Sequence, residues 1–231
     1  MAWLCRRCGY QAEHAGACPR DAEPLFAPPS GSHLGCLLGD YRLVDEIGRG
    51  SMGSVFRAIH TRSSAVVAIK LLRTAAASPE IAARLSREAM VLARLDHPNI
   101  AKVYDLGSFE GRIYLAMELF AGQSLEEVLA RGALPVERAR RIGKQLLSAL
   151  EAAHKEGIIH RDVKPENVLV GDNDRGKLID FGIAHTNDVI SKLTRTGSVL
   201  GTPAYMAPEQ VRAGKTDART DVYAVGMVLW E

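Results

Sequence analysis

The chain has 231 residues, 47% of them apolar and 24% charged, which is the composition of an ordinary globular protein with a sizeable core. A net charge of +2 gives no electrostatic basis for binding nucleic acid or an acidic membrane. The longest apolar runs are too short to span a membrane, and there is no long apolar N-terminal stretch, so we expect no membrane segment and a cytoplasmic location.

Residues 1–25 contain three of the four cysteines, crowded in a way that is unlike a disulfide framework. A C-x-x-C pair followed by glycine resembles one knuckle of a zinc ribbon. The candidate zinc ligands are Cys5, Cys8, Cys18 and Asp21, with the aspartate in the place of a fourth cysteine. His14 is a second candidate for the fourth ligand, and a degenerate knuckle with free thiols is the alternative to metal binding.

Residues 26–40 are rich in Pro, Gly and Ser in their first part and are expected to form a linker. From residue 41 onward, β-branched and apolar residues recur in short runs that predict strands. The predicted strands are Tyr41–Ile47, Ser54–Ile59, Ala65–Leu71, Lys102–Leu106 and Arg112–Met117. A helix is predicted after the third strand, because Ser78 is a good N-cap, Pro79 suits the first helical position and Glu80 suits the first turn.

Helices predominate in the second half of the chain. Ser124 is expected to cap a short helix, and Pro135 opens a long one with an apolar stripe on one face. The predicted elements are helices at Leu125–Arg131 and from Pro135 to about Lys155, then a hairpin of Val168–Val170 and Lys177–Ile179. A strand-rich half followed by a helix-rich half predicts an α+β fold with two lobes.

Residues 48–53 fit the pattern G-x-G-x-x-G. In a dinucleotide-binding fold the third glycine would open a helix, but here residues 54–57 continue as a strand. The glycines are therefore predicted at a hairpin tip, where backbone N–H groups can approach phosphate oxygens. A flexible hairpin turn without a ligand is the alternative.

Lys70 ends a strand-like apolar run, where a lysine is often only the polar member of an alternation. Glu88, however, lies on the apolar stripe of the predicted helix, between Leu85 and Leu92. A carboxylate on a buried face is costly unless it is paired, so Lys70 is predicted to be its partner. Such a pair can aim the ammonium group at nucleotide phosphates.

A polar segment, His160–Asn167, separates the long helix from the predicted hairpin, and Asp180-Phe181-Gly182 follows the second hairpin strand. Pro165 and two acidic residues could form a mere turn. An Asn and an Asp presented from a paired hairpin instead make a hard oxygen site that suits Mg²⁺.

Taken together, residues 41–231 resemble the bacterial, eukaryotic-like serine/threonine protein kinases. The motifs that carry the resemblance, in the family's order and spacing, are Gly48–Val55, Val67–Lys70, Glu88, His160–Asp162, Asp180–Gly182 and Ala207–Glu209. The resemblance implies a bilobal α+β fold, with an antiparallel sheet and one helix at 41–120 and a partial, mainly helical lobe at 121–231.

The resemblance also implies roles for individual residues. Asp162 would accept or orient the proton of the substrate hydroxyl, Lys164 would neutralise the transferring phosphoryl group, and Lys70 with Glu88 would position the nucleotide. The residues implied to hold Mg²⁺ or Mn²⁺ are Asn167 and Asp180.

The cofactor implied is ATP, with its adenine between apolar side chains of the two lobes. The residues implied to bind it are Ile47, Gly48, Arg49, Gly50, Ser51, Met52, Gly53, Val55, Ala68, Lys70, Met117, Glu118, Phe120 and Leu169. Lys164 and Thr202 resemble the serine/threonine kinases rather than the tyrosine kinases, so the expected partners are protein substrates with Ser or Thr.

The segment from Asp180 to Glu209 has little regular pattern and many hydroxyl side chains. A stretch of this kind usually has a function. Arg161, beside the predicted catalytic aspartate, suits capture of a phosphothreonine. The resemblance implies autophosphorylation at Thr194 and Thr196, with a homodimer as a candidate arrangement for reaction in trans.

The sequence thus predicts a serine/threonine protein kinase. An inactive kinase fragment that acts as a nucleotide-binding scaffold, or as an interaction module centred on the cysteine knuckle, is the alternative. Asp221 opens an apolar helix, and the sequence ends at Glu231 without a closing signal. Because the family continues with more helices, we expect a C-terminally truncated kinase domain.

Overall fold

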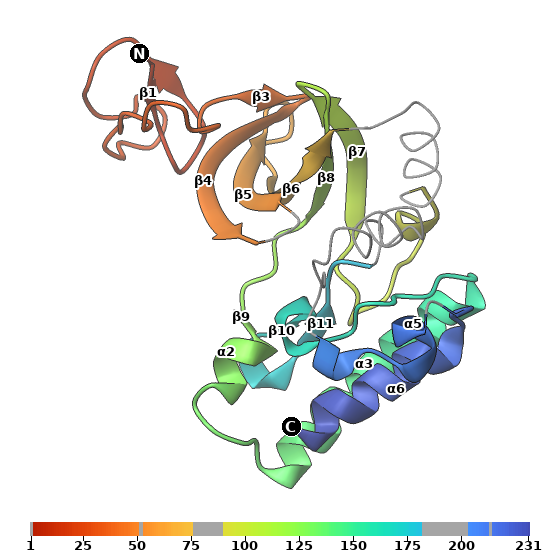
Figure 1. Cartoon of the computed structure of the whole chain (residues 1–231). Coiled ribbons are helices and arrows are strands. Elements are labelled where there is room, and N and C mark those ends of the chain that lie inside the picture. The colour runs from red at the N-terminus through yellow and green to blue at the C-terminus, as the bar shows by residue number, and fades with distance from the viewer. Residues whose placement is uncertain (1, 51–52, 76–89, 182–202, 213) are drawn as a thin grey trace. The chain divides into compact units, whose positions relative to one another are not determined.

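Figure 1 shows the computed structural model, which describes residues 2–50, 53–75, 90–181, 203–212 and 214–231. These residues form two compact units. The first unit comprises Met1–Ala89 and Val103–Leu119, and the second comprises Met90–Lys102 and Phe120–Glu231.

A six-stranded antiparallel sheet dominates the first unit. Its strands, in spatial order, are β3 (Leu37–Leu38), β4 (Tyr41–Arg49), β5 (Gly53–His60), β6 (Val66–Ala75), β8 (Arg112–Glu118) and β7 (Val103–Phe109). Five of them coincide with the predicted strands to within a few residues, because β-branched and apolar side chains pack well on a pleated surface. The pairing of β4 with β5 is interrupted twice, between Leu43 and Asp45 and between Glu46 and Gly48.

The sheet builds the main core of the first unit from alternate residues of its strands. Leu43, Phe56 and Ile69 are at most 2% exposed within this core. Cys36 is half-buried and packs against the same cluster as a small apolar residue.

The N-terminal segment packs against the same unit. β1 (Trp3–Leu4) and β2 (Gln11–Ala12) form a two-stranded antiparallel sheet. Phe26 bridges to Leu4 through backbone hydrogen bonds of 2.8 and 3.0 Å. The division into a knuckle at residues 1–25 and a linker at 26–40 stays a prediction.

The second unit is mainly helical, with one small sheet. The sheet has the order β11-β10-β9 and consists of β9 (Gln123–Ser124), β10 (Val168–Val170) and β11 (Gly176–Leu178). The helices are α2 (Leu125–Leu129), α3 (Val136–Lys155), α5 (Pro208–Val211) and α6 (Ala218–Trp230), with 3-10 turns η1 (Pro165–Asn167), η2 (Asp172–Asp174) and η3 (Pro203–Tyr205). Ser124 caps α2 as predicted: its hydroxyl accepts from Glu127 N at 3.1 Å, and the Glu127 carboxylate accepts from Ser124 N at 3.0 Å.

Helices α3 and α6 pack together and form the core of the second unit. Ile142, Leu146 and Leu150 of α3 recur every four residues and are fully buried. Gly143 permits a close approach, since a Cβ there would lie 2.9 Å from Leu229 Cδ2 of α6.

The β10–β11 hairpin is fastened to α3 by Asn99. The Asn99 side-chain nitrogen donates to Gly176 O at 2.7 Å and to Gln145 Oε1 at 2.8 Å. Leu178 N in turn donates to Asn99 O at 2.8 Å. These bonds fix the strand that leads into Asp180.

The α+β prediction is confirmed, with a sheet-rich unit and a helix-rich unit. Helix α6 begins at Ala218, three residues before the predicted start, because Asp217 caps it. The helix predicted from Ser78 lies largely outside the described residues, of which 90–92 are helical. Among the described helices, none combines the length and the apolar character that crossing a membrane requires.

Candidate active site

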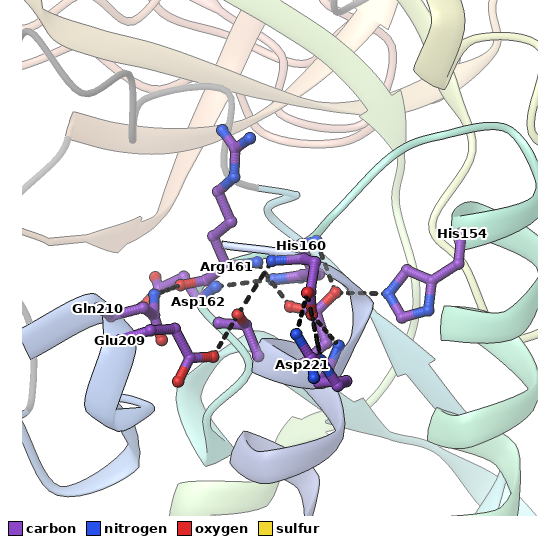
Figure 2. Close-up of polar contacts among 10 residues, drawn as sticks. His154, His160, Arg161, Asp162, Glu209, Gln210 and Asp221 are labelled. Carbon is purple, nitrogen blue, oxygen red and sulfur yellow. Dashed lines mark hydrogen bonds and ion pairs between the residues drawn. The ribbon is translucent and has the colours of Figure 1, made fainter. Parts of the chain in front are cut away.

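The backbone that leads into Asp162 is held by one buried carboxylate, that of Asp221 in the first turn of α6 (Figure 2). Asp221 is 1% exposed, and its two oxygens accept from His160 N and Arg161 N, both at 2.8 Å. His154 Nε2, from the last turn of α3, lies 2.7 Å from Asp221 Oδ2. Arg161 has a φ of 65°, an uncommon backbone conformation for a side-chain-bearing residue, and these bonds hold it there.

His160 fixes the same loop from its other side. Its Nε2 lies 2.9 Å from Ile179 O, and its Nδ1 accepts from Asp162 N at 3.2 Å, so the proton is on Nε2. Burial lowers the pKa of His160 below its ordinary value and keeps the ring neutral. The ring also lies 4.5 Å, between centroids, from Phe181. His160 thus joins the segment before Asp180 to the loop that carries Asp162.

The Asp162 carboxylate has two partners on its own loop. Lys164 Nζ lies 3.0 Å from Asp162 Oδ2, and Asn167 Nδ2 donates to the same oxygen at 2.9 Å. Asn167 Nδ2 also donates to Asp162 O at 2.7 Å. The carboxylate is therefore oriented by a cation and an amide. Because both partners contact Oδ2, the carboxylate can still accept a hydrogen bond from a further donor.

Asn167 and Asp180 lie on adjacent segments. Ile179 N donates to Asn167 O at 2.9 Å, which pairs the residue before Asp180 with the end of η1. Asn167 is 6% exposed, and because its side-chain nitrogen contacts Asp162, its amide oxygen is the remaining acceptor. Carboxylate and amide oxygens form a donor set that suits Mg²⁺.

In the first unit, the glycine-rich segment forms the predicted hairpin between β4 and β5. Gly48 is paired with Val55, and Gly50 N donates to Gly53 O at 2.9 Å. Gly53 has no room for a side chain, because a Cβ there would lie 2.1 Å from Leu71 O. Ser51 and Met52 lie outside the described residues.

Lys70 sits on β6 of the same unit and is half-buried. It is in register with Val55 of the glycine hairpin, and Ala68 is in register with Met117 of β8. Glu88 lies outside the described residues, so the pair that it is expected to form with Lys70 stays a prediction.

The other residues predicted to bind ATP fall on both units. In the first unit, Ile47 and Arg49 are exposed on β4, and Glu118 ends β8 half-buried. In the second unit, Leu169 lies on β10 and Phe120 is half-buried. Their roles in nucleotide binding stay predictions.

The Ala-Pro-Glu segment is joined to the catalytic loop, as Figure 2 also shows. Gln210 Nε2 donates to Arg161 O at 2.8 Å, and Gln210 Oε1 accepts from Ala207 N at 3.1 Å. Glu209 Oε1 accepts from Thr220 Oγ1 at 2.6 Å. Sequence reasoning missed both Gln210 and His154, because neither belongs to a polar cluster in the sequence.

Three cysteines and an aspartate come together at the N-terminus. The possible ligand atoms of Cys5, Cys8, Cys18 and Asp21 all lie within 4.8 Å of one another. Cys5 Sγ is 3.4 Å from each Asp21 carboxylate oxygen, and Cys8 Sγ is 3.5 Å from Cys18 Sγ. Burial raises the pKa of the Cys8 thiol to about 12, and thiol hydrogen bonds lower the pKa of Asp21 to about 2. The structure thus brings Asp21, rather than His14, to the three sulfur atoms.

Comparison with known proteins agrees with this geometry. Residues 41–231 match the protein kinase domain, and the chain belongs to the protein kinase family. Serine/threonine-protein kinase pkn3 of Myxococcus xanthus is 46% identical over 202 residues, which are 83% of this chain and 37% of that protein. Serine/threonine-protein kinase PknH of Mycobacterium bovis is 42% identical over 203 residues, 87% of this chain and 34% of that protein.

The chain is also similar to solved structures of protein kinase domains. The crystal structure of the PknI kinase domain of Mycobacterium tuberculosis superimposes with a TM-score of 0.70 at 32% identity, over 88% of this chain and 76% of that one. The chain spans about a third of the length of the two curated relatives above, 37% and 34%.

Proposed function

We propose that the chain acts as a serine/threonine protein kinase, which transfers the γ-phosphate of ATP to Ser and Thr hydroxyls of proteins. The observation that carries the proposal is the arrangement around Asp162, whose carboxylate contacts Lys164 Nζ at 3.0 Å and Asn167 Nδ2 at 2.9 Å. The names of the relatives, all serine/threonine-protein kinases, support it.

Each of these side chains has a chemical task that fits its position. Asp162 accepts the proton of the substrate hydroxyl, and the Asn167 amide holds the carboxylate in one orientation while it does so. Lys164 carries a positive charge that can stabilise the charge on the oxygens of the phosphoryl group in transfer. Asp221 keeps the backbone of the loop fixed during the reaction through the bonds to His160 and Arg161.

A divalent cation fits the donor set of the second unit. Asn167 and Asp180 would hold Mg²⁺ or Mn²⁺, which supplies neutralisation of phosphate charge when bound. In the first unit, the N–H groups of the glycine hairpin and the Lys70 ammonium group are suited to phosphate, and apolar residues such as Val55 and Ala68 to the adenine.

The test compares phosphate transfer from radiolabelled ATP by the wild type, Asp162→Asn and Lys70→Met. Both variants should lose transfer by about 100-fold or more. Glu137→Gln is a matched carboxylate-to-amide control, since Glu137 is exposed on α3 and pairs only with Arg140 among the described residues. Phosphoamino-acid analysis should find phosphoserine and phosphothreonine. Equal incorporation by all four proteins would refute catalysis by this site and leave a nucleotide-binding scaffold.

Autophosphorylation at Thr194 and Thr196 is part of the same proposal, although both residues lie outside the described part of the chain. It is supported by Arg161, whose Nε is buried without a hydrogen-bond partner among the described residues. A phosphothreonine would supply that partner. We also propose that the protein is cytoplasmic. Autophosphorylation would then occur in trans, with one copy phosphorylating a second copy of the chain. Phosphopeptide mapping that finds active enzyme unmodified at both threonines would contradict the autophosphorylation.

The N-terminal cluster is a second candidate site, for zinc. A tetrahedral zinc with sulfur ligands at about 2.3 Å and an oxygen ligand at about 2.0 Å requires sulfur–sulfur separations of about 3.8 Å and sulfur–oxygen separations of about 3.5 Å. The Cys8–Cys18 separation of 3.5 Å and the Cys5–Asp21 separation of 3.4 Å are close to those values. Metal analysis of the purified chain should find one zinc per chain. The double variant Cys8→Ser, Cys18→Ser should lose it, whereas Cys36→Ser, outside the cluster, should keep it. Zinc-free wild type, purified without chelator, would refute the site.

A further inference from the structure

The cysteine knuckle (residues 1–25) packs on β4 and β5, the two strands joined by the glycine hairpin at residues 48–53, which is proposed to bind phosphate and is called the phosphate-binding hairpin below. Leu4, the residue before the first cysteine, is fully buried and forms a cluster with Val44 of β4 and Ile59 of β5. All of these residues belong to the first unit. The first knuckle turn is therefore seated on the sheet, and the two share apolar core.

Polar contacts cross the same boundary. Arg57 of β5 donates from Nη1 to Arg6 O at 3.0 Å, inside the C-x-x-C turn. Arg42 of β4 donates from Nη1 to Gln11 Oε1 at 2.7 Å and to Gly35 O at 2.9 Å. Both strands thus hold backbone or side chains of the knuckle, and the carbonyl of Arg6 can accept from Arg57 only while the turn keeps its shape.

Gly9 shows how closely the turn approaches the sheet. A Cβ at Gly9 would lie 3.4 Å from Arg42 Cδ and 3.6 Å from side-chain carbons of both Ile59 and Val44. Gly9 N donates to Cys5 O at 2.9 Å, so the glycine is positioned by the turn that presents Cys5 and Cys8. The shape of the cluster therefore determines the shape of the surface that meets β4 and β5.

The contacted strands run directly into the phosphate-binding hairpin. Val44 lies four residues before Gly48 in β4, and Arg57 lies four residues after Gly53 in β5. Two register shifts lie in this stretch of the β4–β5 pair, where ladder bonds are interrupted and strands deform more readily. Contacts at the base of such a hairpin restrict the positions that Gly48 and Gly53 can adopt.

We propose that the knuckle, when it binds metal, positions the phosphate-binding hairpin, with Leu4 and Arg57 as the positioning residues, so that zinc and ATP bind with positive coupling. The proposal rests on the proposed zinc site. With zinc bound, the turn at residues 5–9 keeps the shape that fits β4 and β5. Without it, the contacts at the hairpin base loosen, and ATP binding must order the hairpin at a cost in affinity.

The test measures ATP affinity by calorimetry with a non-hydrolysable ATP analogue and Mg²⁺, on zinc-loaded chain and on chain depleted by chelator. Removal of zinc should weaken analogue binding about 5-fold or more. By linkage, saturating analogue should tighten zinc binding by the same factor, measured in competition with a chromophoric chelator. Hydrogen exchange should quicken in residues 42–48 and 54–60 on zinc removal.

The variant Arg57→Gln tests whether the contact between Arg57 and the cysteine turn is needed for the coupling, in addition to zinc binding itself. This variant leaves all four ligands in place and should bind zinc one to one, but its analogue affinity should respond less to zinc than that of the wild type. Arg62→Gln is the matched control: Arg62 pairs with Asp40 in the same unit and makes no described contact with the knuckle, so coupling should be unchanged. Leu4→Ala, which keeps Arg57, tests the apolar part of the contact in the same way.

The outcomes are distinct. Zinc bound one to one with analogue affinity unchanged by its removal overturns the coupling and leaves both proposed sites intact. Failure to bind zinc overturns the coupling together with the zinc site, and failure to bind the analogue in either state overturns the kinase proposal. Equal coupling in Arg57→Gln, Leu4→Ala and the wild type overturns the assignment of the positioning residues.

Discussion

At the scale of single residues, His160 makes the stability of the catalytic loop depend on pH. Desolvation lowers its pKa in the folded chain below the ordinary value of 6.5, although Asp221, Asp162 and Asp180 oppose the shift. A base with a depressed folded pKa binds its proton more readily when unfolded. The contribution of neutral His160 to the free energy of unfolding is therefore fully present above about pH 6.5 and is lost as the pH falls below that value.

We expect the urea midpoint of the wild type to fall between pH 7.5 and pH 5.5 more than that of His160→Gln. The variant will be less stable at pH 7.5, because the bonds to Ile179 O and Asp162 N are altered, but it lacks the buried titrating group. Each unit by which the folded pKa is depressed corresponds to about 1.4 kcal/mol. Parallel pH dependence in the two proteins would contradict the assignment.

The partners of a residue were harder to predict than the candidate residues themselves. The sequence indicated Asn167 and Asp180 as oxygen ligands beside the predicted hairpin, whereas the role expected for Asp162 came from the resemblance to protein kinases. It left Asp21 and His14 as alternative candidates, because which of them reaches the sulfur atoms depends on the path of the turn. His154 was missed because a single histidine near the end of an amphipathic helix is an ordinary residue until Asp221 is placed beside it.

At the scale of secondary-structure elements, the first turn of α6 supports the catalytic loop. Asp221→Ala would remove the acceptor of the buried His160 N and of the partly buried Arg161 N, and a buried donor left unsatisfied costs about 1–3 kcal/mol. We expect a loss of about 2–5 kcal/mol in the free energy of unfolding and a large fall in kcat, measured by denaturant titration and phosphate transfer.

Asp217→Ala is the matched control on the same helix. Asp217 caps α6 and accepts from Arg219 N at 2.9 Å, so its loss should cost about 1 kcal/mol. It makes no described contact with the catalytic loop, and kcat should stay close to that of the wild type. If the two variants lost kcat equally, α6 would act through its overall stability rather than through Asp221.

The glycine hairpin gives a second prediction at this scale. Gly53→Ala should separate β5 from β6 at the loop, because the added Cβ would lie 2.1 Å from Leu71 O. ATP affinity should fall about 10-fold or more, since Gly53 and the start of β5 would be displaced, and calorimetry with an ATP analogue measures this. Gly226→Ala, in α6 with open space around it, should instead stabilise the chain by about 0.5–1 kcal/mol. Unchanged affinity in Gly53→Ala would contradict the role of the hairpin.

Elements were predicted well where one periodicity dominated. Strands β4, β5 and β8 and helix α3 each have a clear apolar pattern, and their predicted bounds lie within two residues of those observed. The start of α6 was placed too late because its first turn is polar, and only the capping interaction of Asp217 with Thr220 marks it. The pairs β1–β2 and Leu4–Phe26 were not foreseen, because two-residue strands carry no periodicity.

At the scale of the whole molecule, the α+β composition followed from the order of strand-like and helix-like segments, but the place of the N-terminal segment did not. The composition of residues 26–40 predicts a linker, and it does not indicate that Leu34 and Cys36 in that range pack partly buried against the sheet. Such packing depends on which apolar side chains the folded sheet leaves uncovered. Local composition does not contain that information.

The contacts of Leu4 and of Asp221 lie in different units, which predicts independent effects on stability. Leu4 packs on Val44 and Ile59 in the first unit, and Asp221 holds His160 and Arg161 in the second. Leu4→Ala should cost about 2–4 kcal/mol. Because the costs at independent sites without shared partners add, the double variant should lose the sum of the two costs to within about 0.5 kcal/mol.

Peptide-resolved hydrogen exchange shows in which unit each variant loses stability. Leu4→Ala should quicken exchange in β4 and β5 and leave α6 as protected as in the wild type, whereas Asp221→Ala should do the reverse. Leu4→Ala with Val44→Ala is the coupled control, since the two side chains touch and their costs should not add. If Leu4→Ala instead quickened exchange throughout α3 and α6, the two units would unfold as one, and the knuckle would stabilise the whole chain rather than the nucleotide-binding sheet alone.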